Sequence, residues 1–123
     1  MTAYDDDNIF ARILRGEIPC DKVYENDHAL AFRDINPQAP VHILVIPKGR
    51  YVSMDDFSSD ASDAQIAGFT RAVGQVARDA GVDDTGYRIL ANHGRDGQQE
   101  VAHFHVHVFG GKNLGRMIKP VDK

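Results

Sequence analysis

Three of the six histidines fall at alternate positions in one short stretch, as His103, His105 and His107. Apolar residues occupy the positions between them. A period of two is typical of a β-strand, whose successive side chains point to opposite faces, so residues 103–109 are predicted to form a strand with three imidazoles on one face. Burial of imidazole without partners is unfavourable, and strand propensity would favour Val, Ile or Thr at these positions. The row therefore indicates chemistry rather than packing.

Imidazole can act as a nucleophile, an acid, a base or a metal ligand. On one strand, the side chains of His103 and His107 would lie about 13 Å apart, whereas zinc holds each nitrogen ligand at about 2.0–2.1 Å. A metal site would therefore need ligands from elsewhere, such as His42 or Asp34. Nucleophilic or acid–base chemistry needs no such convergence, so both possibilities stay open and catalysis fits the spacing better.

The elements that position these histidines can be read from apolar periodicity and turn residues. Asp7 or Asn8 can cap a short helix that ends at Gly16. A long helix is expected over residues 62–80, with Ser62 and Gln65 at the spacing of a capping box. Short apolar runs bounded by turn residues predict further strands, at residues 22–25, 28–34, 41–46 and 87–92.

Two polar segments are expected to be loops. Residues 52–61 are predicted to lead into the long helix, and residues 93–100 to lead into the histidine row. The second loop lacks the Gly-Lys-Ser/Thr ending of a Walker phosphate loop. The order of short strands with one late, long helix predicts an α+β fold with a mainly antiparallel sheet.

Composition limits the classes of function. A chain of 123 residues is expected to form one domain. Its formal charge of −4, without a basic stripe, argues against a nucleic-acid partner. Cys20 is the only cysteine, which fits a reducing compartment. No signal peptide or membrane-spanning apolar run is visible, so we expect a cytoplasmic protein without a membrane partner.

Three motifs together resemble the histidine-triad (HIT) family. They are the alternating histidines of residues 103–109, the segment 34–42 that runs from Asp34 to His42, and the opening segment 9–19. Within the family, the chain is similar to the Hint branch of nucleoside phosphoramidases, over about residues 8–116. The resemblance implies a five-stranded antiparallel sheet with one long and one short helix, extended across a homodimer. It also implies a single domain over residues 1–123, with residues 1–7 and 112–123 as flexible or partner-contacting tails.

The resemblance also implies an activity. His105 would attack the α-phosphorus of a purine nucleoside phosphoramidate, and water would then release a mononucleotide from a nucleotidyl-histidine intermediate. His107 would contact the phosphate and help to transfer a proton to the leaving group. His103 and His42 would set the tautomer and orientation of their neighbours. No metal or cofactor is required by these roles.

The same resemblance implies a nucleotide-binding set. Asp34 would accept hydrogen bonds from the ribose hydroxyls, and Asn92, Gln99 and Glu100 would surround the phosphate. The base and ribose would be lined by apolar side chains, namely Ile9, Phe10, Ile13, Ile18, Phe32, Ile35 and Leu44. The chain departs from some relatives at Gln98, where they have glycine, and at Glu100, where they have serine.

Three alternatives remain open. A neighbouring branch of the family hydrolyses dinucleoside polyphosphates. The fold could also serve as a non-catalytic nucleotide-binding module. The third alternative is a zinc-binding protein. Deadenylation of DNA, another activity in the family, is disfavoured by the acidic charge.

Overall fold

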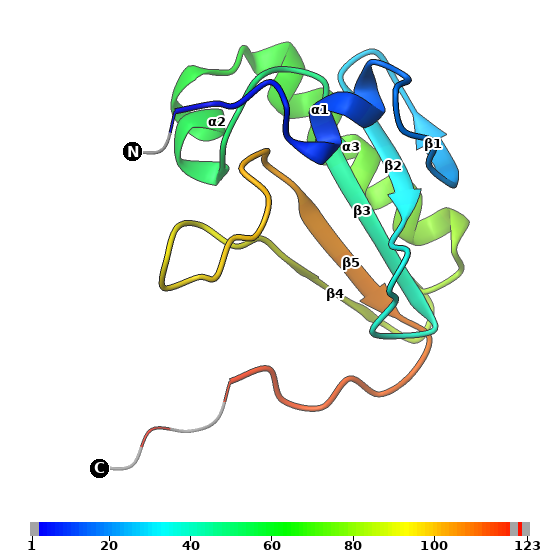
Figure 1. Cartoon of the computed structure of the whole chain (residues 1–123). Coiled ribbons are helices and arrows are strands. Elements are labelled where there is room, and N and C mark those ends of the chain that lie inside the picture. The colour runs from blue at the N-terminus through cyan, green and yellow to red at the C-terminus, as the bar shows by residue number, and fades with distance from the viewer. Residues whose placement is uncertain (1–2, 119–120, 122–123) are drawn as a thin grey trace.

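A five-stranded antiparallel sheet forms the centre of the molecule (Figure 1). The computed structural model describes residues 3–118 and 121. The strands lie in the order β1-β2-β3-β5-β4, and every neighbouring pair is antiparallel. Their bounds are β1 Lys22–Glu25, β2 Ala29–Arg33, β3 Val41–Pro47, β4 Tyr87–Leu90 and β5 Val106–Gly110. The predicted α+β fold with its antiparallel sheet is confirmed.

Helices cover both faces of the sheet. Figure 1 shows α3 (Asp63–Asp79) behind the sheet and α1 (Ile9–Leu14) in front of it. The predicted caps are present: the Asn8 side chain accepts from the backbone N–H of Ala11, and Ser62 and Gln65 form a capping box. None of the helices in the described part of the chain has the length and apolar character needed to cross a membrane.

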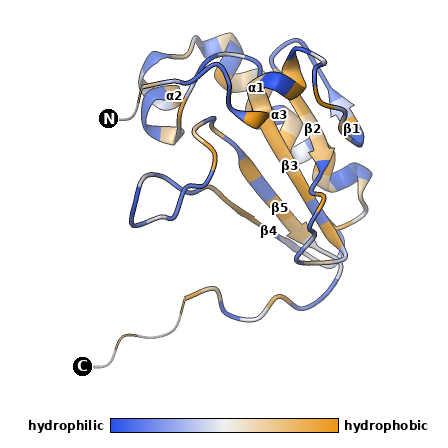
Figure 2. Cartoon of the chain, viewed as in Figure 1, coloured by the Kyte–Doolittle hydropathy of each residue, from blue (hydrophilic) through white to orange (hydrophobic). Residues whose placement is uncertain are grey.

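The alternation of side chains along the strands separates two apolar cores. On β3, Ile43 and Val45 join the core beneath α3, whereas Leu44 and Ile46 join the core beneath α1. Figure 2 shows apolar residues concentrated along β2 and β3, the strands that α1 and α3 enclose. Since the period of a strand is two, His42 takes the α1 side together with Leu44 and Ile46.

Two expectations about local structure are wrong. Residues 52–61 are not only loop, because Met54–Asp60 form a further helix, α2, whose capping box joins Ser53 and Asp56. The side chain of Phe57 packs this helix against the core below α3. This tertiary contact could not be predicted from the polar composition of the segment. The regular strand β5 also begins only at Val106, so the histidine row starts outside it.

The side chains nevertheless alternate between the two faces of the sheet from His103 onward. Phe104 is 1% exposed in the core beneath α3, and its backbone N–H donates to the carbonyl of Tyr51 rather than to β3. His103 and His105 turn toward the opposite side, where the ring of each lies near Phe10 of α1. The three imidazoles therefore share one face, as predicted, although only His107 lies on the regular strand.

Candidate active site

A cavity of about 810 Å³ opens on the α1 side of the sheet. It is bounded by α1, by residues 18–20, by the end of β2 and by the loop that precedes β5. Most of the predicted site residues line it, namely Ile9, Phe10, Ile13, Ile18, Phe32, Asp34, Ile35, Leu44, Asn92, Glu100, His105 and His107. The fold thus brings together residues that are almost 100 positions apart in the sequence.

One ring nitrogen of His105 is fixed by the backbone. Nδ1 lies 2.7 Å from the carbonyl oxygen of His103. A carbonyl can only accept, so Nδ1 carries the proton and Nε2 keeps its lone pair. His105 is only 7% exposed. Its Nε2 has no hydrogen-bond partner among the described residues. Every fully buried side-chain nitrogen and oxygen in the described part of the chain does have a partner. The Nε2 atom is therefore not fully buried and is accessible from the cavity that His105 lines.

The protonation state of His105 also suits a nucleophile. Burial lowers the pKa of the imidazole, and this effect outweighs the hydrogen bond from Nδ1 to the His103 carbonyl and the negative charges of Asp34 and Glu100, all of which raise it. The ring is therefore neutral at physiological pH. A neutral imidazole with a free Nε2 lone pair is a competent nucleophile.

A chain of hydrogen bonds sets the tautomer of His107. The backbone N–H of Gln38 donates to Nδ1 of His42 over 3.1 Å. A backbone amide cannot accept, so His42 carries its proton on Nε2, which lies 3.0 Å from Nδ1 of His107. His107 thus accepts at Nδ1 and carries its proton on Nε2. Because Nδ1 is engaged with His42, Nε2 is the ring nitrogen left for the cavity that His107 lines.

Burial shifts the pKa of His107 strongly. Desolvation of the ring, together with the neighbouring imidazoles of His105 and His42, lowers this pKa to about 4, although the carboxylate of Asp34 acts in the other direction. In the free protein the site therefore presents two neutral imidazoles side by side, with 5.1 Å between the ring centroids of His105 and His107.

His103 lies behind the cavity and does not line it. It is fully buried. Its Nε2 donates to the carbonyl of Pro47 over 2.8 Å, and its Nδ1 accepts from the hydroxyl of Tyr4 over 2.7 Å. Burial lowers its pKa to about 4. His103 therefore positions His105 through its backbone carbonyl and takes no direct part in the cavity.

Tyr4 belongs to the segment that was expected to be a tail. In the same segment, Asp6 pairs with Arg50 at 2.8 Å, and the Arg50 guanidinium lowers the pKa of this exposed carboxyl group. Sequence reasoning missed the contact of Tyr4 with His103. A single tyrosine beside an acidic run gives no periodic signal that could have indicated it.

Asp34 stands at the end of β2 with one carboxylate oxygen engaged. Its Oδ1 accepts from the backbone N–H of Asn36 over 2.8 Å, and its Oδ2 lies 3.5 Å from Nε2 of His42. The side chain is 20% exposed and faces the same cavity as His105. A half-buried carboxylate fixed in this way offers an acceptor for a hydroxyl group of a ligand.

The metal alternative concerns Asp34, His42 and His107. One ligand atom from each lies within 4.8 Å of the others. The distances of 3.0 and 3.5 Å from His42 Nε2 to its two neighbours are close to the edge of about 3.3 Å in a tetrahedral zinc site. The tautomer is unfavourable, however. A metal needs the lone pair of His42 Nε2, and the amide of Gln38 keeps the proton on that nitrogen.

The loop before β5 is braced from outside the cavity. The Gln99 side chain donates to the carbonyls of Val52 and Val101 and accepts from the backbone N–H of Gly94. Gln99, which the resemblance assigns to the phosphate, does not line the cavity, because its side-chain amide is used within the loop. His93 strengthens the brace, with Nδ1 2.7 Å from the Ser53 hydroxyl.

Gln98 occupies the glycine position noted in the sequence. Its φ of 55° lies in the left-handed region that favours glycine. The backbone therefore keeps the conformation that a glycine would adopt here, while the side chain is added to the cavity wall.

Sequence reasoning missed several other lining residues. These are Pro19, Cys20, Arg33, Asn36, Gln38, Asp96, Gly97, Val101, Met117 and Ile118. They lie mainly in irregular segments, where no period indicates which way a side chain points.

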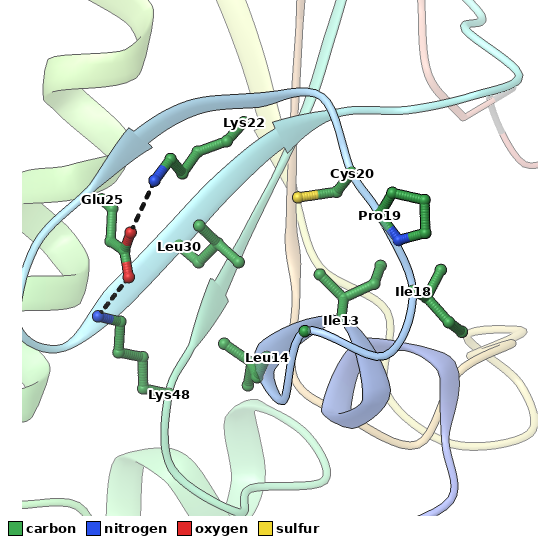
Figure 3. A pocket seen from close by; sticks show the side chains of 10 residues that line it. Ile13, Leu14, Ile18, Pro19, Cys20, Lys22, Glu25, Leu30 and Lys48 are labelled. Atoms are coloured by element: carbon green, nitrogen blue, oxygen red, sulfur yellow. Dashed lines mark hydrogen bonds and ion pairs between the residues drawn. The ribbon is translucent and has the colours of Figure 1, made fainter.

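A second, more open cavity of about 540 Å³ lies on the other side of the wall formed by Ile13 and residues 18–20 (Figure 3). In it, Glu25 pairs with Lys48 at 2.7 Å and with Lys22 at 3.1 Å, in the arrangement drawn in Figure 3. Burial raises the pKa of the Cys20 thiol in this wall. A thiol with a raised pKa is a weak nucleophile at neutral pH, so Cys20 is part of the wall rather than a reactive group.

Comparisons with known proteins identify the family to which this chain is similar. The family model described as "HIT domain" matches residues 15–114. An uncharacterised HIT-like protein of Azospirillum brasilense is 69% identical over 115 residues, which cover 94% of each chain. The purine nucleoside phosphoramidase of Escherichia coli K12 is 42% identical over 113 residues, which cover 92% of this chain and 94% of the relative. A HIT family hydrolase from Clostridium thermocellum superposes with a TM-score of 0.83, at 36% identity, over 93% of this chain and 98% of that chain.

Proposed function

Because the chain belongs to the histidine-triad (HIT) family, we propose that it is a purine nucleoside phosphoramidase that acts through a nucleotidyl-histidine intermediate. The observation that carries the proposal is the Nε2 atom of His105, which keeps a free lone pair in a cavity that also contains the carboxylate of Asp34. The name of the Escherichia coli relative supports the same activity.

In the proposed complex, the purine packs against the apolar side chains of α1, β2 and residue 18. The ribose hydroxyls donate to Asp34, which has a carboxylate oxygen available. The α-phosphate then lies beside His105 and His107, within reach of Asn92. The apolar wall and the carboxylate suit a nucleoside, since burial of a flat apolar base is favourable and the hydroxyls find a fixed acceptor.

The reaction proceeds in two displacements. In the first, the lone pair of His105 Nε2 forms a bond to phosphorus while the P–N bond breaks. The leaving nitrogen takes the electron pair of that bond and a proton from Nε2 of His107, and it departs as an amine. In the second, a water oxygen attacks phosphorus, the bond to His105 Nε2 breaks with its electrons returning to the ring, and a water proton returns to His107. The product is a nucleoside monophosphate.

The low pKa of His107 in the free protein fits this role. A negatively charged phosphate beside the ring raises the pKa of His107, because an opposite charge favours the protonated form. Substrate binding thus creates the acid that the leaving amine needs. His42 and Gln38 orient the ring in its neutral state. Protonation of His107 places a hydrogen on Nδ1 as well, so the hydrogen bond that His42 Nε2 donates to it opens in that state.

We also propose that the active form is a homodimer and that no metal or other cofactor is required. The dimer is supported by β4, which has a neighbouring strand on one side only in the described chain. Tyr87 and Ile89 on this strand are 43% and 53% exposed. The absence of a metal requirement is supported by the tautomer of His42, whose Nε2 is protonated.

The proposal is tested by incubating the protein with adenosine 5′-phosphoramidate and measuring release of AMP. Wild-type protein should release AMP, and His105→Ala should lose at least a factor of about 1,000, since no other group supplies the nucleophile. His28→Ala, which changes a histidine outside the cavity, should retain activity. Unchanged turnover by His105→Ala would refute the assigned nucleophile. Binding of AMP without turnover of this substrate or of a diadenosine polyphosphate would favour the non-catalytic module.

A further inference from the structure

The charge of the cavity is unusual for a site that receives an anion. The described lining residues include three carboxylates, those of Asp34, Asp96 and Glu100, but only one guanidinium, that of Arg33. The Arg33 side chain is paired with Asp21 at 3.2 Å. Since His105 and His107 both have lowered pKa values, the cavity is acidic at neutral pH.

The three acids differ in how their charge is used. Asp34 accepts from the Asn36 amide, and Asp96 pairs with Arg95 at 3.1 Å. Glu100 has no hydrogen bond or ion pair from its side chain to any described residue. Its charge nevertheless acts on His105, whose pKa it raises against the larger effect of burial. Glu100 is therefore an unpaired carboxylate on the wall of the cavity that His105 also lines.

Position in the cavity indicates which part of a substrate meets Glu100. The apolar wall for the base comes from α1, residue 18 and β2, whereas Glu100 lies on the loop before β5, together with Asn92 and Gln98. A carboxylate beside phosphoryl oxygens would repel them. The part of the substrate that this residue can favour is therefore the group that extends beyond the phosphorus, on the leaving side.

We propose that Glu100 is a specificity-determining residue, which selects phosphoramidates whose leaving amine carries a second, positively charged group. This inference rests on the proposed function, because it concerns the leaving group of that reaction. It predicts that alkyl diamines are better leaving groups than neutral amines of the same length. It also predicts that polyphosphate leaving groups, which bring additional negative charge to the same place, are disfavoured.

The expected effect is modest because Glu100 is exposed. An exposed charge pair changes an equilibrium by about two- to fivefold. The effect should decrease at high ionic strength, since the Debye length falls to about 3 Å at 1 M salt. It should be found mainly in KM, because the distant ammonium group is charged both in the bound substrate and in the transition state.

The experiment compares two adenosine 5′-phosphoramidates, one made from 1,3-diaminopropane and one from n-butylamine, which replaces the ammonium group by a methyl group. The ratio of their kcat/KM values is measured at low salt for the wild type and for Glu100→Gln. We expect Glu100→Gln to lower the ratio about threefold. The control Asp83→Asn, which removes one negative charge from the turn between α3 and β4, should leave the ratio unchanged.

Each outcome bears on a different claim. A ratio that is the same in Glu100→Gln as in the wild type, with both compounds hydrolysed, overturns the role of Glu100 and leaves the phosphoramidase activity in place. Hydrolysis of neither compound by the wild type overturns the activity and with it this inference. An independent measurement uses diadenosine tetraphosphate, for which Glu100→Gln should change turnover in the opposite direction and increase it. A decrease there would contradict the charge argument.

Discussion

The ring of His42 lies directly behind that of His107, with 5.2 Å between the ring centroids and 3.0 Å between His42 Nε2 and His107 Nδ1. His42 is buried and does not line the cavity. It therefore affects a ligand only through His107, whose tautomer it sets. We expect His42→Ala to lower kcat by roughly 10- to 100-fold with a smaller change in KM, because a misoriented proton donor mainly affects the chemical step.

The pH–rate profile distinguishes this role from a merely structural one. In His42→Ala, His107 is free to exchange tautomers and loses a neighbouring imidazole that lowers its pKa. The ionisation assigned to His107 should therefore move to higher pH. A variant that loses activity in proportion to lost folded protein, with the profile unchanged, would contradict the assignment.

Protonation of the buried histidines should destabilise the fold in acid. The pKa values of His103 and His107 are about 4 in the folded state, whereas the value for an unperturbed histidine is 6.5. Between these values the unfolded chain binds more protons, so the free energy of unfolding falls as pH decreases from about 6.5 to about 4. We expect the midpoint of urea denaturation to fall across this window.

Two comparisons sharpen that measurement. His103→Gln should show a shallower fall, because one of the two groups is removed. The pKa values of the Glu17 and Glu25 carboxylates are lowered by Arg15 and by the two neighbouring lysines, respectively. These two groups therefore lower the free energy of unfolding only when the pH falls below the usual pKa range of a glutamate. A midpoint that stays constant from pH 6.5 to 4 would contradict the burial argument.

Removal of the Tyr4 hydroxyl should lower the free energy of unfolding more than its position near the N-terminus suggests. Tyr4→Phe leaves Nδ1 of the fully buried His103 without its donor. An unsatisfied buried acceptor costs about 1–3 kcal/mol, and we expect a decrease of this size in the free energy of unfolding. Tyr24→Phe on β1 is the matched control. Equal effects of the two changes would argue that the contact between Tyr4 and His103 is not maintained in solution.

Chelation should have no effect on turnover. The only described group of three potential metal ligands, formed by Asp34, His42 and His107, requires His42 Nε2 to lose the proton that the Gln38 amide keeps there. Treatment with EDTA should therefore leave AMP release unchanged. Activity that is lost on chelation and restored by zinc, but not by magnesium, would establish the metal alternative.

A charge on the edge strand should separate the proposed dimer. Ile89→Lys places a lysine on β4, and a charged edge strand resists pairing with another strand. Light scattering should report half the wild-type mass. Met54→Lys is a control for added charge at an apolar residue of α2 that is 49% exposed, and this variant should keep the wild-type mass. A wild-type protein that is already monomeric would refute the proposed assembly.

Regular periods in the sequence were sufficient for most of the fold. The alternation on β3, the caps at Asn8 and Ser62 and the long helix α3 are all present, because each depends on residues close together in the sequence. The helix α2 was not predicted, since it is held by Phe57 against residues distant in the chain. Local pattern does not report such a contact.

Several residues of the candidate site could be predicted from the sequence, but the hydrogen bonds of their side chains could not. Motifs indicated His105, His107 and Asp34, which the cavity brings together. They assigned Gln99 to the phosphate, whereas its side-chain amide is directed at Val52 and Val101, and they gave no account of Tyr4, whose partner is 99 residues away. Such connections depend on side-chain directions in irregular segments, and these are fixed only when the whole chain is folded.

The division of β3 and β5 between two faces has a consequence for insertions and deletions. Because the period of a strand is two, one residue added within Val106–Gly110 would move the imidazole of His107 into the apolar layer under α3 and turn a valine toward the cleft. A single inserted residue would therefore remove the catalytic imidazole from the cavity and disrupt the apolar core together. Changes of length in this protein should therefore be tolerated only in connecting segments, where an added residue alters no strand register.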